Sequence, residues 1–418
     1  MANQEVRAEP ESRVRRRDET GRGAARFKVV ELGHWITGPL AAQVLADFGA
    51  SVIKVESLGG DPFRVWRGGD SQSPRFAAYN RGKRSMCLDL KEEAGLQILH
   101  RVLADADVLV CAFRPRVVAE LSLNYEVVAR EHPRLVACYI SGFGRHGPKA
   151  EQPGYETSAQ ALSGLLSTLI APEAPKAVGP PVVEFVTALY AACAVLDCLF
   201  EREVTGHGRR VDVSMLGGAL SFMSEPLAVW RSGGEVFSSR SRPAFSQAYM
   251  FICKDGEMLA LHLSSSEKNW QSLIDVVGNP RELSELARYA TREARVANFD
   301  TIQQILAPTF ATRDCVEWLR ALDEAEVPCA PVNRVDQLED DPQVRALGLI
   351  RGIAQADVNA GFTVVGSPIE GGPGHGSEFV VPALGQHTEA VLKEVGYSEE
   401  EVAKFLELGV AGPSPRPR

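Results

Sequence analysis

The sequence lacks several features that would assign it to a common class of protein. Its 418 residues include 45 basic and 54 acidic side chains and carry a net charge of −9. There is no excess of Lys and Arg that could cover a nucleic-acid surface. No apolar run reaches the length of a membrane span. We therefore expect neither nucleic acid nor a membrane as a partner.

Disulfide and metal-site patterns are also missing. The 8 cysteines are scattered without a C-x-x-C pair, and the 8 histidines are dispersed without the spacing of metal ligands. Free, scattered thiols are typical of a reducing compartment. We therefore expect a cytoplasmic protein with no bound metal.

The N-terminal segment has almost no large apolar side chains. It contains three consecutive arginines and several acids, but no apolar core of a secretory signal and too many acids for an organelle transit peptide. Residues 1–26 are predicted to be a disordered tail.

The pattern that follows predicts an α/β fold. Residues 28–32 and 51–56 read as strands on either side of a helix at 39–48, which is a β-α-β unit. Further helix patterns follow at 92–104, 117–123 and 125–130, and further strand patterns at 106–113 and 135–141. Such alternation builds a doubly wound sheet with helices on both faces.

A second, smaller domain is predicted in the middle of the chain. The segment 27–220 is assigned to the large domain, 221–330 to a small α+β domain with its linkers, and 331–418 to the C-terminal part of the large domain. Within 221–330, a hairpin is expected over 248–263 with its turn at 254–256, and helices over 266–279 and 281–325.

The stretch from Glu184 to Gly208 is the most informative part of the chain. Glu184 directly precedes an apolar run at 185–200, and Gly206 and Gly208 are stop signals for a helix. A run that is apolar on every side predicts a buried helix. Glu184 would then lie at the helix N-terminus, where an ionised carboxylate is favoured. It is either a nucleophile or an ordinary helix cap.

Two other patterns are relevant to ligand binding. Gly142, Gly144 and Gly147 spell G-x-G-x-x-G, but Pro148 and a polar stretch follow where a dinucleotide fingerprint needs a helix. The basic segments NRGKRS at 80–85 and FRPR at 113–116 flank predicted strands. They could hold phosphate groups, or they could be solvated surface charge.

These motifs together resemble family III CoA-transferases, the CaiB/BaiF group that includes formyl-CoA transferase and carnitine CoA-transferase. The resemblance covers nearly everything from Phe27 to Val410. It rests on LADFGASVIKVE at 45–56, NRGKRSMCLDLK at 80–91, FRP at 113–115, SGFGRHGP at 141–148, PGYE at 153–156, TGHGRRVDVSM at 205–215, VPCAPVN at 327–333, DPQVRALGLI at 341–350 and GQHTEAVLKEVGY at 385–397.

The resemblance implies a large Rossmann-like domain made from both chain ends, a small domain, and a dimer of two interlocked, ring-like chains. It also implies a reaction in which a carboxylate takes an acyl group from acyl-CoA as an anhydride and then carries CoA as a thioester. CoA and acyl-CoA would be substrates, a carboxylic acid would be the acceptor, and no cofactor would be held permanently.

The resemblance further implies a set of site residues. Glu184 occupies the position of the family nucleophile, and Glu156 is expected to be a structural hydrogen-bonding carboxylate. CoA would be bound by Asn80, Lys83, Arg84, Phe113 and Arg114, and main-chain groups near Ile36, Thr37 and Tyr155 would line the acyl site.

Some positions depart from the family pattern and leave alternatives open. Glu184 replaces the family Asp, Ala112 replaces a common Asn, and Glu120 stands where formyl-CoA transferase has a CoA-contacting Arg. The chain is therefore either a CoA-transferase or a catalytically inactive subunit of a heteromeric enzyme such as benzylsuccinate CoA-transferase.

An acyl-CoA racemase is less favoured, because Tyr155 stands at the position of the racemase His and a phenol with a pKa of about 10 is a poor base. Arg231, Arg240 and Arg242 would suit a dicarboxylate donor such as succinyl-CoA, unless they are surface arginines.

Overall fold

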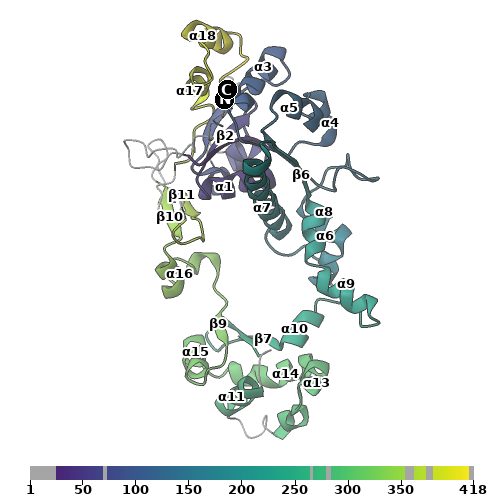
Figure 1. Cartoon of the computed structure of the whole chain (residues 1–418). Helices are drawn as coiled ribbons and strands as arrows, with labels where there is room; N and C mark the ends of the chain where they lie inside the picture. The colour runs from purple at the N-terminus through teal and green to yellow at the C-terminus, as the bar shows by residue number, and fades with distance from the viewer. Residues whose placement is uncertain are drawn as a thin grey trace, which may run out of the picture. The chain divides into compact units, whose positions relative to one another are not determined.

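The computed structural model describes residues 25–68, 73–263, 267–278, 284–353, 362–372 and 380–413, which form two compact units (Figure 1). Unit 1 comprises Met1–Glu156, Pro181–Gly218 and Leu349–Arg418, and unit 2 comprises Thr157–Pro180 and Ala219–Gly348. The expected tail falls on residues 1–26, of which 1–24 lie outside the described residues.

The unit boundaries differ in detail from the domain limits expected from the sequence. Thr157–Pro180 belongs to unit 2, and unit 1 resumes at Leu349 rather than at 331. Strand β9, Cys329–Pro331, still pairs with a strand of unit 2, so the chain leaves that unit only after it.

Unit 1 is built on a parallel sheet of six strands in the order β3-β2-β1-β4-β5-β6. The order reverses between β1 and β4, and such a switch point creates a crevice at the carboxyl ends of the strands. Helices cover both faces of the sheet, and all four residues of β4, VLVC, are apolar and fully buried. The strands are β1 (Phe27–Leu32), β2 (Ala50–Glu56), β3 (Arg84–Cys87), β4 (Val108–Cys111), β5 (Val136–Ser141) and β6 (Arg210–Ser214).

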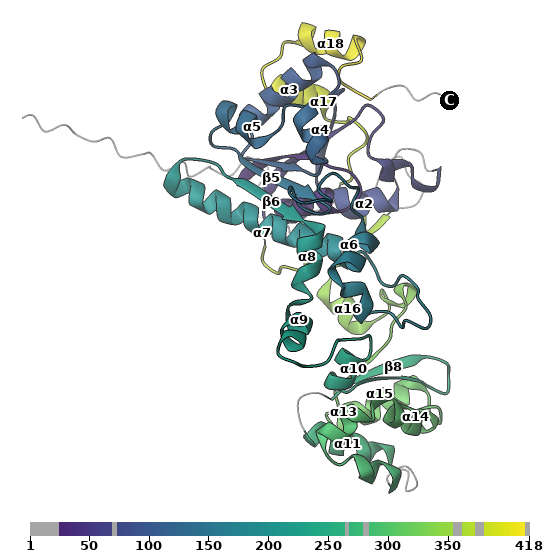
Figure 2. The same cartoon turned by 90° about the vertical axis from the view of Figure 1, so that its right-hand side faces the viewer.

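Each face of this sheet has its own apolar core. Helices α1 (Thr37–Asp47) and α7 (Val182–Thr205) pack on one face. The other face is covered by α3 (Glu93–Ala104), α4 (Pro115–Glu120) and α5 (Tyr125–Glu131), joined by the C-terminal helices α17 (Thr388–Glu394) and α18 (Glu399–Glu407). Figure 2 shows α17 and α18 beside α3.

Helix α7 ends as the sequence predicts but is not buried all round. Gly206 follows it in the left-handed region, with φ 77°. Its inner face packs Ala188, Ala191 and Val195 into the core. The expectation of full burial is wrong, because only that face meets the sheet and α1. Apolar side chains on the outer face are exposed, namely Phe185, Leu189, Tyr190, Phe200 and Val204.

The same helix is long and apolar enough to cross a membrane by length and composition, contrary to the sequence expectation. Among the described residues it is the one helix that meets these criteria. The core helices of soluble proteins can meet them as well. Its packing against α1, β5 and β6 accounts for the apolar residues of its inner face.

Unit 2 contains an antiparallel sheet in the order β7-β8-β9, with β7 (Ala248–Ile252) and β8 (Met258–His262). The predicted hairpin is confirmed: Ala248 pairs with His262 and Ile252 with Met258. Its core includes Trp270, Phe310 and Trp318 from α11 (Glu267–Val277), α14 (Phe299–Phe310) and α15 (Cys315–Glu324).

Shorter elements complete the description of the two units. They are η1 (Pro62–Gly68), α2 (Pro74–Asn80), α6 (Glu156–Ser163), η2 (Leu165–Thr168), α8 (Met215–Ser221), α9 (Ser224–Arg231), α10 (Ser241–Ser246), η3 (Ala287–Tyr289), α13 (Arg292–Ala297), η4 (Val335–Gln337), α16 (Pro342–Leu347) and the hairpin strands β10 (Ile350–Ile353) and β11 (Phe362–Val365).

A fully buried ion-pair network lies at the carboxyl end of β1 and β2. The Glu31 carboxylate accepts from Lys54 Nζ and Lys83 Nζ, both at 2.8 Å. Lys83 also donates to the Pro39 carbonyl and to Asn80 Oδ1. Burial alone would raise the pKa of Glu31, but the two ammonium groups hold it below its usual range. The network ties β1, β2 and the loop before β3 together.

Removing the central carboxylate of this network should destabilise unit 1. Glu31→Gln removes the carboxylate that Lys54 and Lys83 share; Lys54 keeps its buried ion pair with Asp61 at 3.1 Å, but Lys83 loses its carboxylate partner. Breaking a buried ion pair costs about 3–5 kcal/mol. We expect that loss in the free energy of denaturant unfolding, followed by circular dichroism. Asp105→Asn, which removes the exposed partner of Lys28, should cost less than about 1 kcal/mol. Equal losses for the two variants would contradict this account.

Candidate functional site

A pocket of about 830 Å³ lies in unit 1 at the carboxyl ends of the parallel strands. Its size is within the range of small-molecule sites. The loops that follow the strands line it, with residues 34–38 after β1, 57–59 after β2, 88–91 after β3 and 112–117 after β4. The pocket therefore occupies the ligand-binding edge that the strand order predicts.

The loop between β1 and α1 is held in a strained conformation. Trp35 has φ 66°, a left-handed value that is unfavourable for a bulky side chain. Its ring packs edge-on against Phe63, with 5.0 Å between ring centroids. Helix α1 then starts at Thr37 with no side-chain cap. Backbone N–H groups at an uncapped helix start favour an anion.

Glu156 caps the other helix that begins at the pocket. Pro181, the residue before α7, provides no side-chain cap. Instead, the Glu156 carboxylate accepts from the backbone N–H of Val183 at 3.0 Å and from that of Glu184 at 2.9 Å. Glu156 therefore has the structural hydrogen-bonding geometry that the sequence suggested, and its charge satisfies the N-terminus of α7.

The side chain of Glu184 lines the pocket and is half-buried. Burial, together with the nearby charge of Glu156, raises its pKa to about 7. The helix N-terminus was expected to favour an ionised Glu184, but burial and the charge of Glu156 oppose its ionisation. Near neutral pH, Glu184 exists as both acid and carboxylate.

The surroundings of Glu184 leave its carboxylate open to the pocket. Within the described ranges, no hydrogen bond or ion pair engages its side-chain oxygens. Tyr79 is close enough that burial and the charge of Glu184 raise the pKa of its phenol. The Tyr79 ring also contacts that of Phe185, at 6.2 Å between centroids. A carboxylate without a fixed partner is free to react with an electrophile.

Most of the predicted site residues meet at this pocket. Its lining includes Glu184, Ile36, Thr37 and Tyr155, together with Phe113 and Arg114. Arg114 is exposed and directly precedes α4, whose first residue is Pro115.

Asn80, Lys83 and Arg84, which were expected to bind CoA, lie outside the lining of this pocket. Asn80 and Lys83 are buried in the Glu31 network, and burial lowers the pKa of Lys83 to about 8. Lys83 Nζ is already occupied by three acceptors. Arg84 pairs with Glu394 of α17 through two bonds of 2.8 Å. None of the three lines the pocket.

The structure adds pocket residues that were not assigned a role from the sequence. Lys91 brings one more cation to the lining, beside Arg116 of the FRPR segment, which pairs with Glu120 at 3.2 Å. His34 also lines it, and burial lowers the pKa of this imidazole. Lys91 ends the NRGKRSMCLDLK motif shortly after β3, so its place beyond the carboxyl end of a parallel strand was a usable signal.

Two glycines explain the position of the loop that carries Tyr155 and Glu156. A Cβ atom on Gly154 would lie 2.3 Å from the Cα atom of Gly142, so the two backbones touch only because neither residue has a side chain. In the G-x-G-x-x-G stretch, Gly144 and Gly147 have φ of 93° and 94°. No helix starts there until α6 at Glu156, as expected for a stretch that is not a dinucleotide fingerprint.

Comparison with known proteins gives consistent results for sequence and structure. Residues 25–388 match the sequence model of a protein family described as CoA-transferase family III. An acetyl-CoA:oxalate CoA-transferase from Acetobacter aceti is 32% identical over 329 residues, covering 77% of this chain and 84% of that protein. An acyl-CoA transferase from Fusarium pseudograminearum (strain CS3096) is 30% identical over 401 residues, covering 92% of this chain and 87% of that protein.

The fold has a close match among solved structures. A CAIB/BAIF family protein from Brucella suis superposes with a TM-score of 0.76 at 29% identity, covering 89% of this chain and 99% of that one. The resemblance inferred from the motifs is thus confirmed, and the chain belongs to CoA-transferase family III.

Proposed function

We propose that this protein is an active CoA-transferase that moves CoA from an acyl-CoA to a carboxylic acid, with Glu184 as the nucleophile. The observation that carries the proposal is the unpaired, half-buried carboxylate of Glu184 in the lining of the pocket. Family membership supports the reaction type. The identity of the nucleophile rests on the geometry.

The proposed reaction proceeds through covalent intermediates and needs no ATP. A Glu184 oxygen attacks the thioester carbonyl carbon, the carbon–sulfur bond breaks, and CoA thiolate leaves a mixed anhydride behind. The thiolate attacks the Glu184 carbonyl, which releases the donor acid and forms a glutamyl-CoA thioester. The acceptor carboxylate then attacks that thioester and forms a second anhydride. The thiolate finally takes the acceptor acyl group and restores Glu184.

The phosphates of CoA would be bound by the cationic part of the lining. Lys91, Arg114 and Arg116 are all exposed and all belong to the pocket. The ammonium and guanidinium groups form strong charge-assisted hydrogen bonds to phosphate oxygens. The uncapped start of α1 at Thr37 supplies further N–H donors.

The donor and the assembly remain proposals. Succinate–glutarate CoA-transferase from Agrobacterium fabrum is 30% identical over 387 residues, which supports a dicarboxylate donor such as succinyl-CoA. Of the arginines considered for such a donor, Arg240 pairs with Asp300 inside unit 2.

The exposed apolar face of α7 supports the interlocked dimer implied by the family. The cytoplasmic location is supported by 8 cysteines without a disulfide in the described residues.

Trapping the covalent intermediate tests whether Glu184 is the nucleophile. Incubation with succinyl-CoA or acetyl-CoA, followed by borohydride, should reduce the glutamyl thioester at Glu184 to an alcohol that mass spectrometry detects. Glu184→Gln should give no reduced product and lose at least about 1000-fold in transfer rate. Glu184→Asp should be about 100-fold slower, because its carboxylate falls roughly 1 Å short.

The inactive-subunit alternative makes the opposite prediction in the same experiment. Glu184 would stay unmodified with every donor, while a co-purifying homologous chain would be labelled. That pattern would overturn the proposal and favour a structural or regulatory role.

The pH dependence of the reaction should report the raised pKa of Glu184. Only the carboxylate form attacks, so kcat/KM should rise with pH and level off above a pKa of about 7. Glu156→Gln removes the negative charge that contributes to the shift, so the rise should move to lower pH. Measurement of kcat/KM from pH 5 to 9 for the wild type and for Glu156→Gln would show this shift. Identical pH profiles for the two proteins would contradict the role of Glu156.

Stability gives an independent readout of the same group. Because the folded state raises the pKa of Glu184, its contribution to stability is present below the unfolded pKa of about 4.3 and is lost as pH rises through about 7. As the pH is raised from 5 to 8, the thermal midpoint of Glu184→Gln should therefore increase relative to that of the wild type.

The binding of CoA can be tested with two arginines that the sequence did not distinguish. Arg114→Ala should raise the KM for acyl-CoA by about 10-fold or more, because a hydrogen bond to a charged group contributes about 1.5–3 kcal/mol. Arg84→Ala should leave KM almost unchanged, since its partner is Glu394. A larger effect at Arg84 in steady-state kinetics would contradict this placement.

A further inference from the structure

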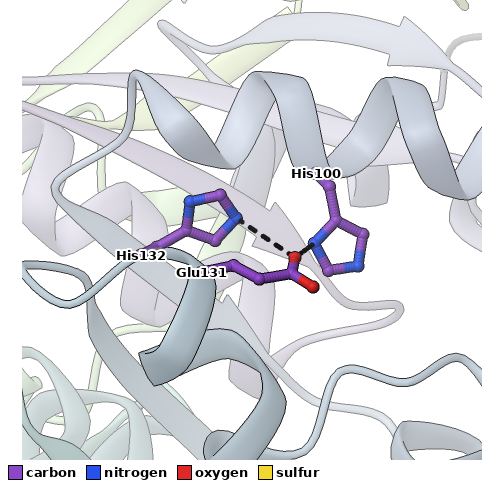
Figure 3. Close-up of side chains that lie close together, drawn as sticks. All are labelled: His100, Glu131 and His132. Atoms are coloured by element: carbon purple, nitrogen blue, oxygen red, sulfur yellow. Dashed lines mark ion pairs between the residues drawn. The ribbon is translucent and has the colours of Figure 1, made fainter.

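Two histidines and one glutamate converge outside the pocket, on the helices that cover one face of the sheet. His100 belongs to α3, Glu131 is the last residue of α5, and His132 follows it directly. Figure 3 shows both imidazole rings turned toward the same carboxylate oxygen. Glu131 Oε2 lies 2.8 Å from His100 Nδ1 and 4.0 Å from His132 Nε2.

The two ring nitrogens that face the carboxylate are buried, and their contacts with Glu131 are ion pairs that do not have hydrogen-bond geometry. Neither His100 Nδ1 nor His132 Nε2 makes a hydrogen bond within the described residues. The short contact between His100 and Glu131 is therefore at most an ion pair. The side chains of His100 and His132 are 21% and 11% exposed, and that of Glu131 is 49% exposed. Buried polar atoms in proteins nearly always have a partner, so this pair calls for an explanation.

The separations suit a shared metal ion. One ligand atom from each of the three residues lies within 4.8 Å of the others. Zinc binds imidazole nitrogen and carboxylate oxygen at about 2.0–2.2 Å, so tetrahedral ligand atoms stand about 3.3–3.5 Å apart. The distances of 2.8 Å and 4.0 Å from Glu131 Oε2 to the two histidine nitrogens fall on either side of that value. Small rotations of the exposed Glu131 side chain would even them out.

We propose that His100, Glu131 and His132 form a binding site for a divalent transition-metal ion of the zinc class. Two imidazoles and one carboxylate favour zinc over magnesium or calcium, which prefer oxygen ligands throughout. The ion would join α3 to the C-terminal end of α5. None of the three residues lines the pocket. The role of the bound ion is therefore to stabilise this layer of unit 1 and not to take part in CoA transfer.

Metal titration of the untagged protein, after dialysis against a chelator, tests the site. Calorimetry with ZnCl₂ should show one tight site per chain, and cobalt(II) should give the visible absorption of a site with nitrogen and oxygen ligands. Zinc should also raise the thermal midpoint, whereas MgCl₂ should not. His100→Ala and His132→Ala should each weaken zinc binding by about 10- to 100-fold or more, since even an outer-shell loss costs that much.

Two controls keep the test decisive. Glu131→Gln alters an exposed side chain and should fold normally, yet it should lose affinity and the thermal gain. His207→Ala removes an exposed histidine that is not in the cluster and should bind zinc like the wild type. The absence of stoichiometric binding would overturn the proposal. Binding that survives in all three cluster variants, or that is lost equally in His207→Ala, would overturn it as well.

Discussion

The capping of α7 by Glu156 is the interaction on which the candidate site depends. A carboxylate from another segment takes up the N–H groups of Val183 and Glu184, so the helix start needs no anion of its own. Glu184 is thereby left without the stabilisation that a helix N-terminus normally gives. Its side chain faces the pocket as a half-buried acid with a pKa of about 7. Position and reactivity of the proposed nucleophile thus come from one arrangement of backbone and carboxylate.

A second constraint lies beneath the pocket. The Glu31 network fixes the ends of β1 and β2 and holds the loop before β3 against them. It uses Asn80 and Lys83, two members of a motif that marks the family. These polar residues therefore support the pocket from within the protein, and the exposed cations of the neighbouring loops are left to meet a ligand. A motif can be specific to a family without touching the substrate.

Much of the architecture was predictable from the sequence because it depends on local patterns. Alternating apolar segments indicated the parallel strands, and Gly206 marked the end of α7. Glu184 stood out as a lone carboxylate before an apolar run. The pocket lining was harder, because Lys83 and Arg114 are both cations beside a strand. Only the three-dimensional position of Glu31 shows that one of them is buried. Likewise, His100 lies far from His132 in sequence, so no spacing rule could bring them together.

The exposed outer face of α7 has a consequence for the chemistry at its first turn. Phe185 is 43% exposed and directly follows Glu184. Any surface that covered Phe185, whether a second chain or a bound acyl group, would also displace water from the neighbouring acid. Less hydration makes the charged form of Glu184 costlier and so raises its pKa further. Dimer assembly and substrate entry would then both change the protonation equilibrium of Glu184. Whether the outer face of α7 is covered would therefore influence when Glu184 becomes reactive.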